Sequence, residues 1–276
     1  MIDAHDVAEV DRLVRLVAER EILPRFGHLR SADIKEKAPG DLVTVADQAA
    51  ETALSQGLTA ILPGSVVVGE EGVSTDPSVL KRLDDDAPVW IVDAIDGTHN
   101  FVAENSRYST LVALAHRGAL LASWTYIPVF DTMATATAGG GAFVDGQQVR
   151  VRESQPSLRF LDTVAPHPRY WAGDIGQAQF NALGGSGVSL SFYDLAGLEY
   201  IELASGRRGA MVVTWENVWD HAAGLLLHAE AGGTTKTLDG SAFRLTGSNA
   251  LPFVVAPDEA TATALCDVLA SPAARG

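Results

Sequence analysis

The stretch Trp90-Ile91-Val92-Asp93-Ala94-Ile95-Asp96-Gly97-Thr98 runs from an apolar segment into two acidic residues and a glycine. The apolar segment is typical of a buried strand, and we predict that this strand ends at Asp93. Because Asp93 and Asp96 are three residues apart across that end, both carboxylates and the carbonyl of Ile95 can face one small volume. Oxygen ligands of this kind suit a hard divalent cation.

Gly97 and Thr98 extend the same stretch with a candidate anion site. Backbone N–H groups at a turn or at the start of a helix can bind a phosphate, and a glycine lets the anion approach closely. An Asp-x-x-Asp pair followed by glycine is, however, also typical of an ordinary surface turn. A calcium-binding loop that begins at Asp93 is excluded, because its sixth position would be Thr98 and that position requires glycine.

Other acidic residues stand where further strands are expected to end or helices to begin. They are Glu70 and Glu71 after the β-branched run 66–68, Asp220 at the start of a helix over 220–230, and Asp47 at the start of the helix that follows 42–45. Unrelated surface turns would not be expected to place an acid at the end of each of several separate elements. We therefore interpret them as parts of one site.

Composition and charge narrow the classes of partner. The chain has 276 residues, 47% of them hydrophobic and 20% charged, as in an ordinary globular protein. We expect a single domain over 1–276, with 1–150 and 151–276 as candidate halves. The formal net charge of −15 argues against a nucleic acid polymer or an anionic membrane as partner. An acidic protein that binds an anionic substrate needs local positive charge, which divalent cations supply compactly.

The compartment is expected to be the cytoplasm. The single cysteine, Cys266, excludes an intrachain disulfide and is interpreted as a buried structural thiol. The sequence contains no apolar run near the ~20 residues that span a bilayer.

The hydrophobic periodicity predicts a layered α+β fold. We expect helices over 6–23, 194–205, 220–230 and 258–270, strands over 108–116, 119–127 and 130–137, and a loop at Gly184, Gly185 and Gly187. The strands of the middle region are expected to pair mainly antiparallel. Helices and strands alternate without a regular βαβ rhythm, which favours α+β layering.

Several segments closely resemble the signature segments of the inositol monophosphatase family. They are Gly69-Glu70-Glu71, the stretch from Trp90 to Phe101, and Trp219-Asp220-His221-Ala222-Ala223-Gly224, with Asp41 to Asp47 upstream and Gly141-Ala142-Phe143 and Gly146 downstream. Their order and spacing also fit. The resemblance covers about residues 5–270.

The resemblance implies a layered αβαβα sugar-phosphatase fold, Mg²⁺-dependent hydrolysis of phosphate monoesters with two or three Mg²⁺ ions per site, and a homodimer. It assigns the ligands and anion donors as follows: Glu70, Asp93 and the Ile95 carbonyl for the first metal, Asp93, Asp96 and Asp220 for the second, and Gly97 and Thr98 for the phosphate. The implied catalytic residues are Asp47, Glu70 and Thr98. Thr98, hydrogen-bonded to Asp47, would position the attacking water, and Glu70 would help to deprotonate it.

The chain departs from the family pattern in two places. Ala94 stands where the family usually has proline, which removes no ligand. The stretches that would contact the alcohol read Tyr193 to Gly197 and Val213 to Asn217, without the family's hydroxyl-binding residues. Asp194 could replace one of them or could cap a helix, and the role of Glu216 stays open.

Four residues beside the motifs have open or structural roles. Trp219 is expected to pack beneath the site and orient Asp220. His99 and His221 are assigned to packing or to the substrate rim, because hard cations prefer oxygen ligands. Glu71 either takes a weak part at the metal site, or is a hydrogen-bonding neighbour of the metal ligands or a solvated turn residue.

Three functions follow as alternatives. The first is hydrolysis of inositol 1-phosphate or a related sugar or polyol phosphate, with histidinol phosphate, fructose 1,6-bisphosphate and 3′-phosphoadenosine nucleotides as sister substrates. The second is a phosphate- or metal-binding regulator that has the fold without the activity, suggested by Ala94 and the altered substrate stretches. The third is a glycosidase, which the close spacing of Asp93 and Asp96 disfavours, because a sugar must fit between catalytic acids about 5–9.5 Å apart.

Overall fold

The strands of this protein form two sheets and a separate hairpin. The computed structural model describes residues 2–155 and 157–270. Within these residues, a seven-stranded sheet has the order β3-β4-β5-β6-β7-β8-β9, and a five-stranded sheet has the order β11-β10-β12-β14-β13. We call them the large sheet and the small sheet. The hairpin pairs β1 (Ile34–Ala38) with β2 (Asp41–Thr44).

The large sheet is built from consecutive segments of the first half of the chain. Its strands are β3 (Val66–Gly69), β4 (Val89–Asp96), β5 (Ser109–His116), β6 (Ala119–Ile127), β7 (Thr132–Thr137), β8 (Gly141–Val144) and β9 (Gln147–Gln148). The strands of the small sheet are β10 (Asp162–Ala165), β11 (Ser189–Phe192), β12 (Ala210–Val213), β13 (Thr234–Thr237) and β14 (Phe253–Ala256).

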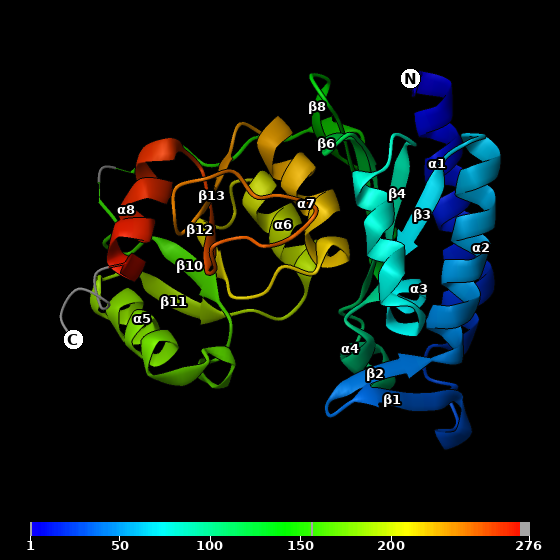
Figure 1. Cartoon of the computed structure of the whole chain (residues 1–276), viewed down its shortest axis with the longest axis horizontal. Helices are drawn as coiled ribbons and strands as arrows, with labels where there is room; N and C mark the ends of the chain where they lie inside the picture. Colours follow the sequence, from blue (N-terminus) through cyan, green and yellow to red (C-terminus); the bar gives the residue numbers. More distant parts are fainter. Residues whose placement is uncertain (1, 156, 271–276) are drawn as a thin grey trace.

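The longer helices cover the faces of both sheets. They are α1 (Ala4–Val17), α2 (Val45–Ile61), α5 (Gly173–Gly185), α6 (Ala196–Ala204), α7 (Val218–Glu230) and α8 (Glu259–Ala270), with the short α3 (Glu70–Thr75) and α4 (Thr98–Val102) beside the large sheet. α1 and α2 pack on one face of the large sheet, α6 and α7 lie between the two sheets, and α5 and α8 cover the small sheet (Figure 1). This order of layers confirms the αβαβα architecture.

The middle helices connect the two halves of the molecule. α7 contacts β4 to β7 of the large sheet and β13 of the small one, and α6 contacts β5, β6 and β12. We therefore propose that the described chain folds as one unit. The predicted halves 1–150 and 151–276 correspond to the two sheets, and residues 1, 156 and 271–276 lie outside the described residues.

β4 decides where the site forms. All eight of its residues are buried, because it pairs in parallel with β3 and antiparallel with β5. Asp93 lies opposite Leu111 and Asp96 opposite Ser109, so β4 contains one residue more than its partner at this point. In a regular strand, residues three apart point to opposite faces. The extra residue is a β-bulge, and it lets both carboxylates face the same side.

Several predicted elements differ from the structure. The strands and helices of the middle and C-terminal regions are confirmed to within a few residues, and the β4–β9 pairing is antiparallel as expected. The predicted loop at Gly184 and Gly185 is wrong, since both lie in α5. The helix expected over 6–23 ends at Val17 and continues as a π-helical turn, Ala18–Ile22. In the small sheet, β10 pairs in parallel with β11 and β12.

In the described part of the chain, none of the helices combines the length and the apolar character needed to cross a bilayer.

Candidate active site

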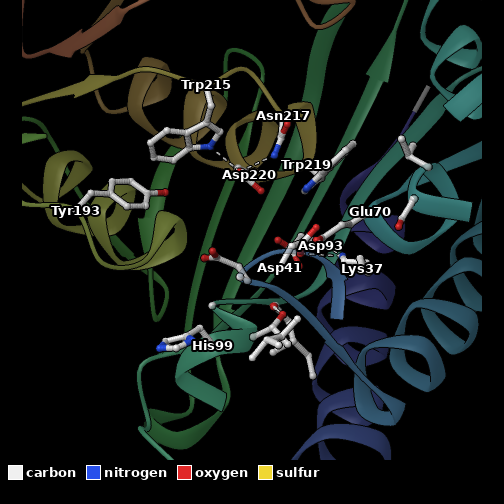
Figure 2. Close-up of a pocket in the computed structure, with 18 of the residues that line it drawn as sticks. Lys37, Asp41, Glu70, Asp93, His99, Tyr193, Trp215, Asn217, Trp219 and Asp220 are labelled. Carbon is white, nitrogen blue, oxygen red and sulfur yellow. Dashed lines mark hydrogen bonds and ion pairs between the residues drawn. The ribbon is translucent and has the colours of Figure 1, made fainter. Parts of the chain in front are cut away.

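A cavity of about 680 Å³ opens where β4 ends, between the β1–β2 hairpin and the start of α7 (Figure 2). Its lining includes every residue that the sequence predicted as a metal ligand or phosphate donor: Glu70, Asp93, Ile95, Asp96, Gly97, Thr98 and Asp220. These residues come from four elements, namely α3, β4, α4 and α7, and the glycine that precedes α4. Tertiary folding thus brings them together, although they are spread over about 150 residues.

Asp93 is almost completely buried in the site. Its side chain is 3% exposed, and its Oδ1 atom is a buried oxygen without a hydrogen-bond partner. Burial raises the pKa of this carboxyl well above its usual range, and the nearby charges of Glu70 and Asp96 raise it further. A buried carboxylate among other carboxylates is unfavourable unless a cation neutralises it. The unpartnered oxygen therefore fits a metal ligand.

Asp96 is held by two hydrogen bonds to the same oxygen. Ser109 Oγ donates to Asp96 Oδ2 over 2.7 Å, and the backbone N–H of Gly197 donates over 2.8 Å. Burial nevertheless raises the pKa of Asp96 to about 6. A Cβ atom at Gly197 would lie 2.2 Å from Ser109 Oγ, so the close approach of α6 to this carboxylate requires glycine. The contact fixes the orientation of Asp96.

Asp220 is oriented by a residue that the sequence analysis did not single out. Trp215 Nε1 donates to Asp220 Oδ2 over 2.6 Å, and the indole nitrogen points at the carboxylate in Figure 2. Burial together with Asp96 and Glu70 raises the pKa of Asp220. Trp219, which we expected to pack beneath the site and orient Asp220, packs against a core cluster and also lines the cavity. No pattern at Trp215 itself indicated this contact, since the loop that carries it has no regular periodicity.

Lys37 is the second residue that sequence reasoning missed. Its Nζ atom lies 2.7 Å from Glu70 Oε1, 2.9 Å from Glu71 Oε1 and 3.5 Å from Asp41 Oδ1. Burial lowers the pKa of the ammonium, but Glu70 and Glu71 outweigh burial and hold the pKa above its usual value. Lys37 therefore stays charged and pairs with both glutamates. Glu71 is thus a half-buried partner of Lys37 and not a solvated turn residue.

The acids do not form a closed metal cluster in this arrangement. Across residues 2–155 and 157–270, no group of three or more His, Cys, Asp or Glu side chains converges as a metal site. Glu70 is engaged by Lys37, and like charges repel one another when no cation lies between them. The donor set is nevertheless chemically suited to Mg²⁺, because it consists of carboxylate and carbonyl oxygens.

Asp47 and Thr98 lie in contact with each other beside the acidic residues of the cavity. Thr98 Oγ1 is 3.0 Å from Asp47 Oδ1 and 3.0 Å from the Ile95 carbonyl, so its single proton has two acceptors. The backbone N–H of Thr44 donates to Asp47 Oδ2 over 2.8 Å. Asp47 is 2% exposed, and burial raises the pKa of its carboxyl. This pair matches the predicted geometry of a water-positioning residue and its acceptor.

Gly97 requires the conformational freedom of glycine. Its φ of +85° lies in the left-handed region, and a Cβ atom there would lie 2.8 Å from Leu195 Cδ1 and 3.1 Å from the Arg107 carbonyl. The next residue, Thr98, begins α4. Gly97 and Thr98 both line the cavity, and Gly97 brings no side chain into it.

The alcohol side of the cavity is formed by loops. Asp194 forms an ion pair with Arg107 and accepts a longer hydrogen bond, 3.4 Å, from Asn100 Nδ2. It does not cap α6, whose N-cap is Leu195 without a side-chain hydrogen bond. The N-cap alternative for Asp194 is therefore wrong. Asp194 lines the cavity, and its contact with the alcohol of the substrate remains a proposal.

Aromatic rings form the wall beside Asp220. Tyr193 and Trp215 meet edge to face with centroids 4.8 Å apart, and Figure 2 shows the Tyr193 hydroxyl directed into the cavity. His99 also lines the cavity. Glu216 points elsewhere and accepts hydrogen bonds from the Asn249 backbone and side chain, at 2.8 and 2.9 Å. It therefore stabilises the loop before β14.

His221 belongs to the core behind the site. It is fully buried and contacts the rings of Trp215, Phe243 and Phe253. Burial lowers the pKa of its imidazole to about 3, so the ring is neutral. This supports the assignment of His221 to packing.

Comparisons with known proteins agree with this geometry. The family model described as the inositol monophosphatase family matches residues 3–271. An inositol-1-monophosphatase of Mesorhizobium japonicum is 30% identical over 259 residues, which is 92% of each chain. An inositol monophosphatase of Dictyostelium discoideum is 33% identical over 207 residues, 74% of this chain and 75% of the relative.

Solved structures show the same fold. The extragenic suppressor protein suhB of Bartonella henselae superposes with a TM-score of 0.80 at 25% identity, over 95% of this chain and 98% of that one. SaIMPase-II, at 21% identity, has been solved with inositol monophosphate and with 2′AMP bound, with TM-scores of 0.70 and 0.76. These structures cover 97% and 99% of this chain and 90% and 100% of their own.

The layered fold, the acidic cavity and these matches define the class of protein, a phosphoric monoester hydrolase. The chain belongs to the inositol monophosphatase family.

Proposed function

We propose that this enzyme hydrolyses phosphate monoesters of small polyols, with inositol 1-phosphate as the first candidate and Mg²⁺ as the cofactor. The observation that carries the proposal is the unpartnered, buried Oδ1 of Asp93 on a cavity that the further acids Glu70, Asp96 and Asp220 also line. Relatives named inositol-1-monophosphatase support the substrate class. The net charge disfavours nucleic acid polymers and anionic membranes as partners.

The ligands would divide between two ions, with a third ion as a further option. Glu70, Asp93 and the Ile95 carbonyl would hold the first, and Asp93, Asp96 and Asp220 would hold the second. When bound, Mg²⁺ would neutralise phosphoryl charge and lower the pKa of a water molecule.

The protein side chains would orient the reactants. With its proton donated to Asp47, Thr98 Oγ1 has lone pairs that can accept a hydrogen bond from the attacking water. Glu70 would accept the proton that this water loses. The N–H groups of Gly97 and Thr98 would contact the phosphoryl oxygens. Because water is the nucleophile, we expect no covalent enzyme intermediate.

A second candidate substrate is an alcohol that carries a flat ring. It is favoured by the Tyr193–Trp215 wall, since aromatic rings pack on one another and bases stack on such side chains. SaIMPase-II, which shares this fold, has been solved with 2′AMP. Histidinol phosphate and 3′-phosphoadenosine nucleotides have such rings, whereas inositol 1-phosphate and fructose 1,6-bisphosphate do not.

A panel of phosphate monoesters tests these proposals. Phosphate release would be measured for all four named substrates, with Mg²⁺ and with excess chelator. We expect turnover that requires Mg²⁺ and is fastest for a polyol phosphate. Fastest turnover of a ring-bearing substrate would instead establish the second candidate. Activity in excess chelator would contradict the mechanism.

The non-catalytic alternative has its own outcome. A regulator with this fold would bind inositol 1-phosphate in calorimetry but release no phosphate from any substrate. Cytoplasmic localisation and a homodimer remain predictions, which cell fractionation and light scattering can test.

A further inference from the structure

A further carboxylate, Glu51, lies behind the active site and contacts the chain next to Glu70. It projects from α2 and is 8% exposed. Its Oε2 accepts the backbone N–H of Glu71 and its Oε1 accepts that of Gly72, both over 2.8 Å. One side chain thus holds two successive backbone donors in the first turn of α3. That turn carries Glu70 and Glu71.

The packing around Glu51 is tight. A Cβ atom at Gly69 would lie 2.4 Å from Glu51 Cδ, so the carboxylate fits against backbone that only glycine provides. Its position therefore fixes where β3 ends and α3 begins. A side chain at position 69 would displace the Glu51 carboxylate.

Glu51 shares α2 with Asp47. The two residues are four apart in a helix, which places them on the same face one turn from each other. Asp47 contacts Thr98, and Glu51 contacts the residues after Glu70. α2 is therefore positioned to support both the water-positioning residue and the predicted base.

Backbone donors are the only partners that the structure shows for the Glu51 carboxylate within residues 2–155 and 157–270. Glu51 also lines a second cavity of about 530 Å³, together with residues that include Ser55, Gln56 and Arg82. Because two N–H groups converge on Glu51, an acceptor with two oxygens is required. An amide would turn an NH₂ group toward one of these donors.

We propose that Glu51 is a positioning residue that fixes Glu70 and thereby sets the affinity of the site for divalent cations. The inference rests on the proposed function, because it takes Glu70 as a metal ligand. Residues that hold metal ligands in place change metal affinity by about 10–100-fold when they are replaced. Glu51 itself touches neither substrate nor metal.

Mn²⁺ binding measured by electron paramagnetic resonance tests this proposal without relying on turnover. Mn²⁺ suits the same oxygen ligands as Mg²⁺. In Glu51→Gln we expect the Mn²⁺ dissociation constant to rise about tenfold or more. The Mg²⁺ concentration for half-maximal phosphate release would rise by a similar factor, while kcat at saturating Mg²⁺ would stay within about threefold of the wild type.

Glu51→Asp separates position from charge. Aspartate keeps the negative charge but is one methylene shorter, so it cannot reach both donors. Positioning predicts that Glu51→Asp loses metal affinity as Glu51→Gln does. Wild-type affinity in Glu51→Asp would show that the charge alone matters and would overturn the proposal.

Glu230→Gln is the matched control for a loss of structure. Glu230 also accepts two backbone N–H groups, those of Gly139 and Gly141, over 2.8 and 2.9 Å, at the turn between β7 and β8. We expect this variant to have a lower Tm but an unchanged Mn²⁺ dissociation constant. If Glu51→Gln lowered the Tm likewise and left Mn²⁺ affinity unchanged, Glu51 would be merely structural.

The failure of this inference is distinguishable from failure of the proposed function. A wild-type protein that binds Mn²⁺ but releases no phosphate would contradict the phosphatase activity and leave the comparison of dissociation constants intact. An active wild type whose Glu51 variants bind Mn²⁺ normally would contradict only the role of Glu51.

Discussion

The two sides of the cavity are built in different ways. The phosphate side comes from the end of a fully buried strand, the glycine turn after it and α2. Backbone pairing fixes the positions of Asp93 and Asp96, and a side-chain hydrogen bond to Asp47 holds Thr98. The alcohol side comes from the loops around Tyr193 and Trp215 and from the exposed pair of Asp194 and Arg107. Rigid strand ends suit a reaction centre that must be accurate, whereas loops tolerate sequence change and can alter specificity.

This contrast explains why the reaction class is better defined than the substrate. The phosphate side contains the predicted ligands in one cavity. The alcohol side has aromatic rings and an ion pair, but no group that points to one particular alcohol. Three predictions test the contrast, and one, on Glu199 of α6, tests a buried carboxylate outside the cavity lining. They follow in order of decreasing expected effect.

Asp93→Asn should have the largest effect. It removes a charge that both proposed metal sites share, so we expect kcat/KM to fall by at least about 10²–10³-fold, as when a group that stabilises the transition state is lost. The metal-free variant should also be at least as thermostable as the wild type, because a buried like-charge repulsion is relieved. Phosphate release and Tm in chelator measure the two effects. Unchanged turnover would refute the mechanism.

Glu199→Gln should change the pH dependence of stability. Glu199 is 1% exposed and pairs with Arg208 over 3.1 Å. Burial raises its pKa to about 7 from 4.5, although Arg208 opposes the shift. Between pH 4.5 and about 7, the Glu199 carboxyl therefore keeps its proton in the folded state but loses it in the unfolded state. The stabilisation, at most about 3 kcal/mol, is present below pH 4.5 and is lost as the pH rises through 7.

Urea unfolding at pH 5 and pH 8 measures this dependence. The wild type should lose more stability between these values than Glu199→Gln does. Glu202→Gln, on the same helix and paired with Arg207 at the surface, is the control and should follow the wild type. Equal losses in the wild type and Glu199→Gln would show that Glu199 is already ionised at pH 5.

Trp215→Phe tests a residue that contacts both sides of the cavity. It keeps an aromatic ring beside Tyr193 but removes the N–H donor to Asp220. We expect the Mg²⁺ concentration for half-maximal activity to rise about tenfold. Trp219→Phe, at a residue that packs against the core cluster, is the control. A larger effect at Trp219 than at Trp215 would restore Trp219 as the orienting residue.

Asp194→Asn should have the smallest effect. Its ion pair with Arg107 is partly exposed, at 36% and 43% of the two side chains, and such pairs contribute about 1 kcal/mol or less. We expect a change in KM of about fivefold or less for inositol 1-phosphate, with kcat unchanged. A loss of kcat comparable to that of Asp93→Asn would mean that the alcohol side takes part in the chemistry.

Sequence reasoning recovered the residues whose spacing has a local meaning. Asp93, Asp96 and Gly97 are close together in the chain, so their pattern was visible. Asp47, Glu70 and Asp220 were visible as acids at the ends of other elements, and the resemblance assigned their roles. Lys37, Glu51 and Trp215 were missed because their partners, Glu70, Gly72 and Asp220, lie in other elements or in an irregular loop. The loop expected at Gly184 and Gly185 was wrong because packing of α5 against α8 stabilises the helix despite the low helix propensity of glycine.

By itself the sequence predicted a layered α+β fold from hydrophobic periodicity and a set of acids that fits a divalent cation from motif spacing. Its motifs also resemble one family, and that resemblance implied the αβαβα layering. Only the tertiary structure decided that Asp93 and Asp96 share a face, through a bulge opposite Leu111 and Ser109. It alone also decided that Lys37 neutralises Glu70 and that Trp215 holds Asp220. The physical reason is that bulges and charge pairs depend on neighbours distant in the chain, which no local pattern records.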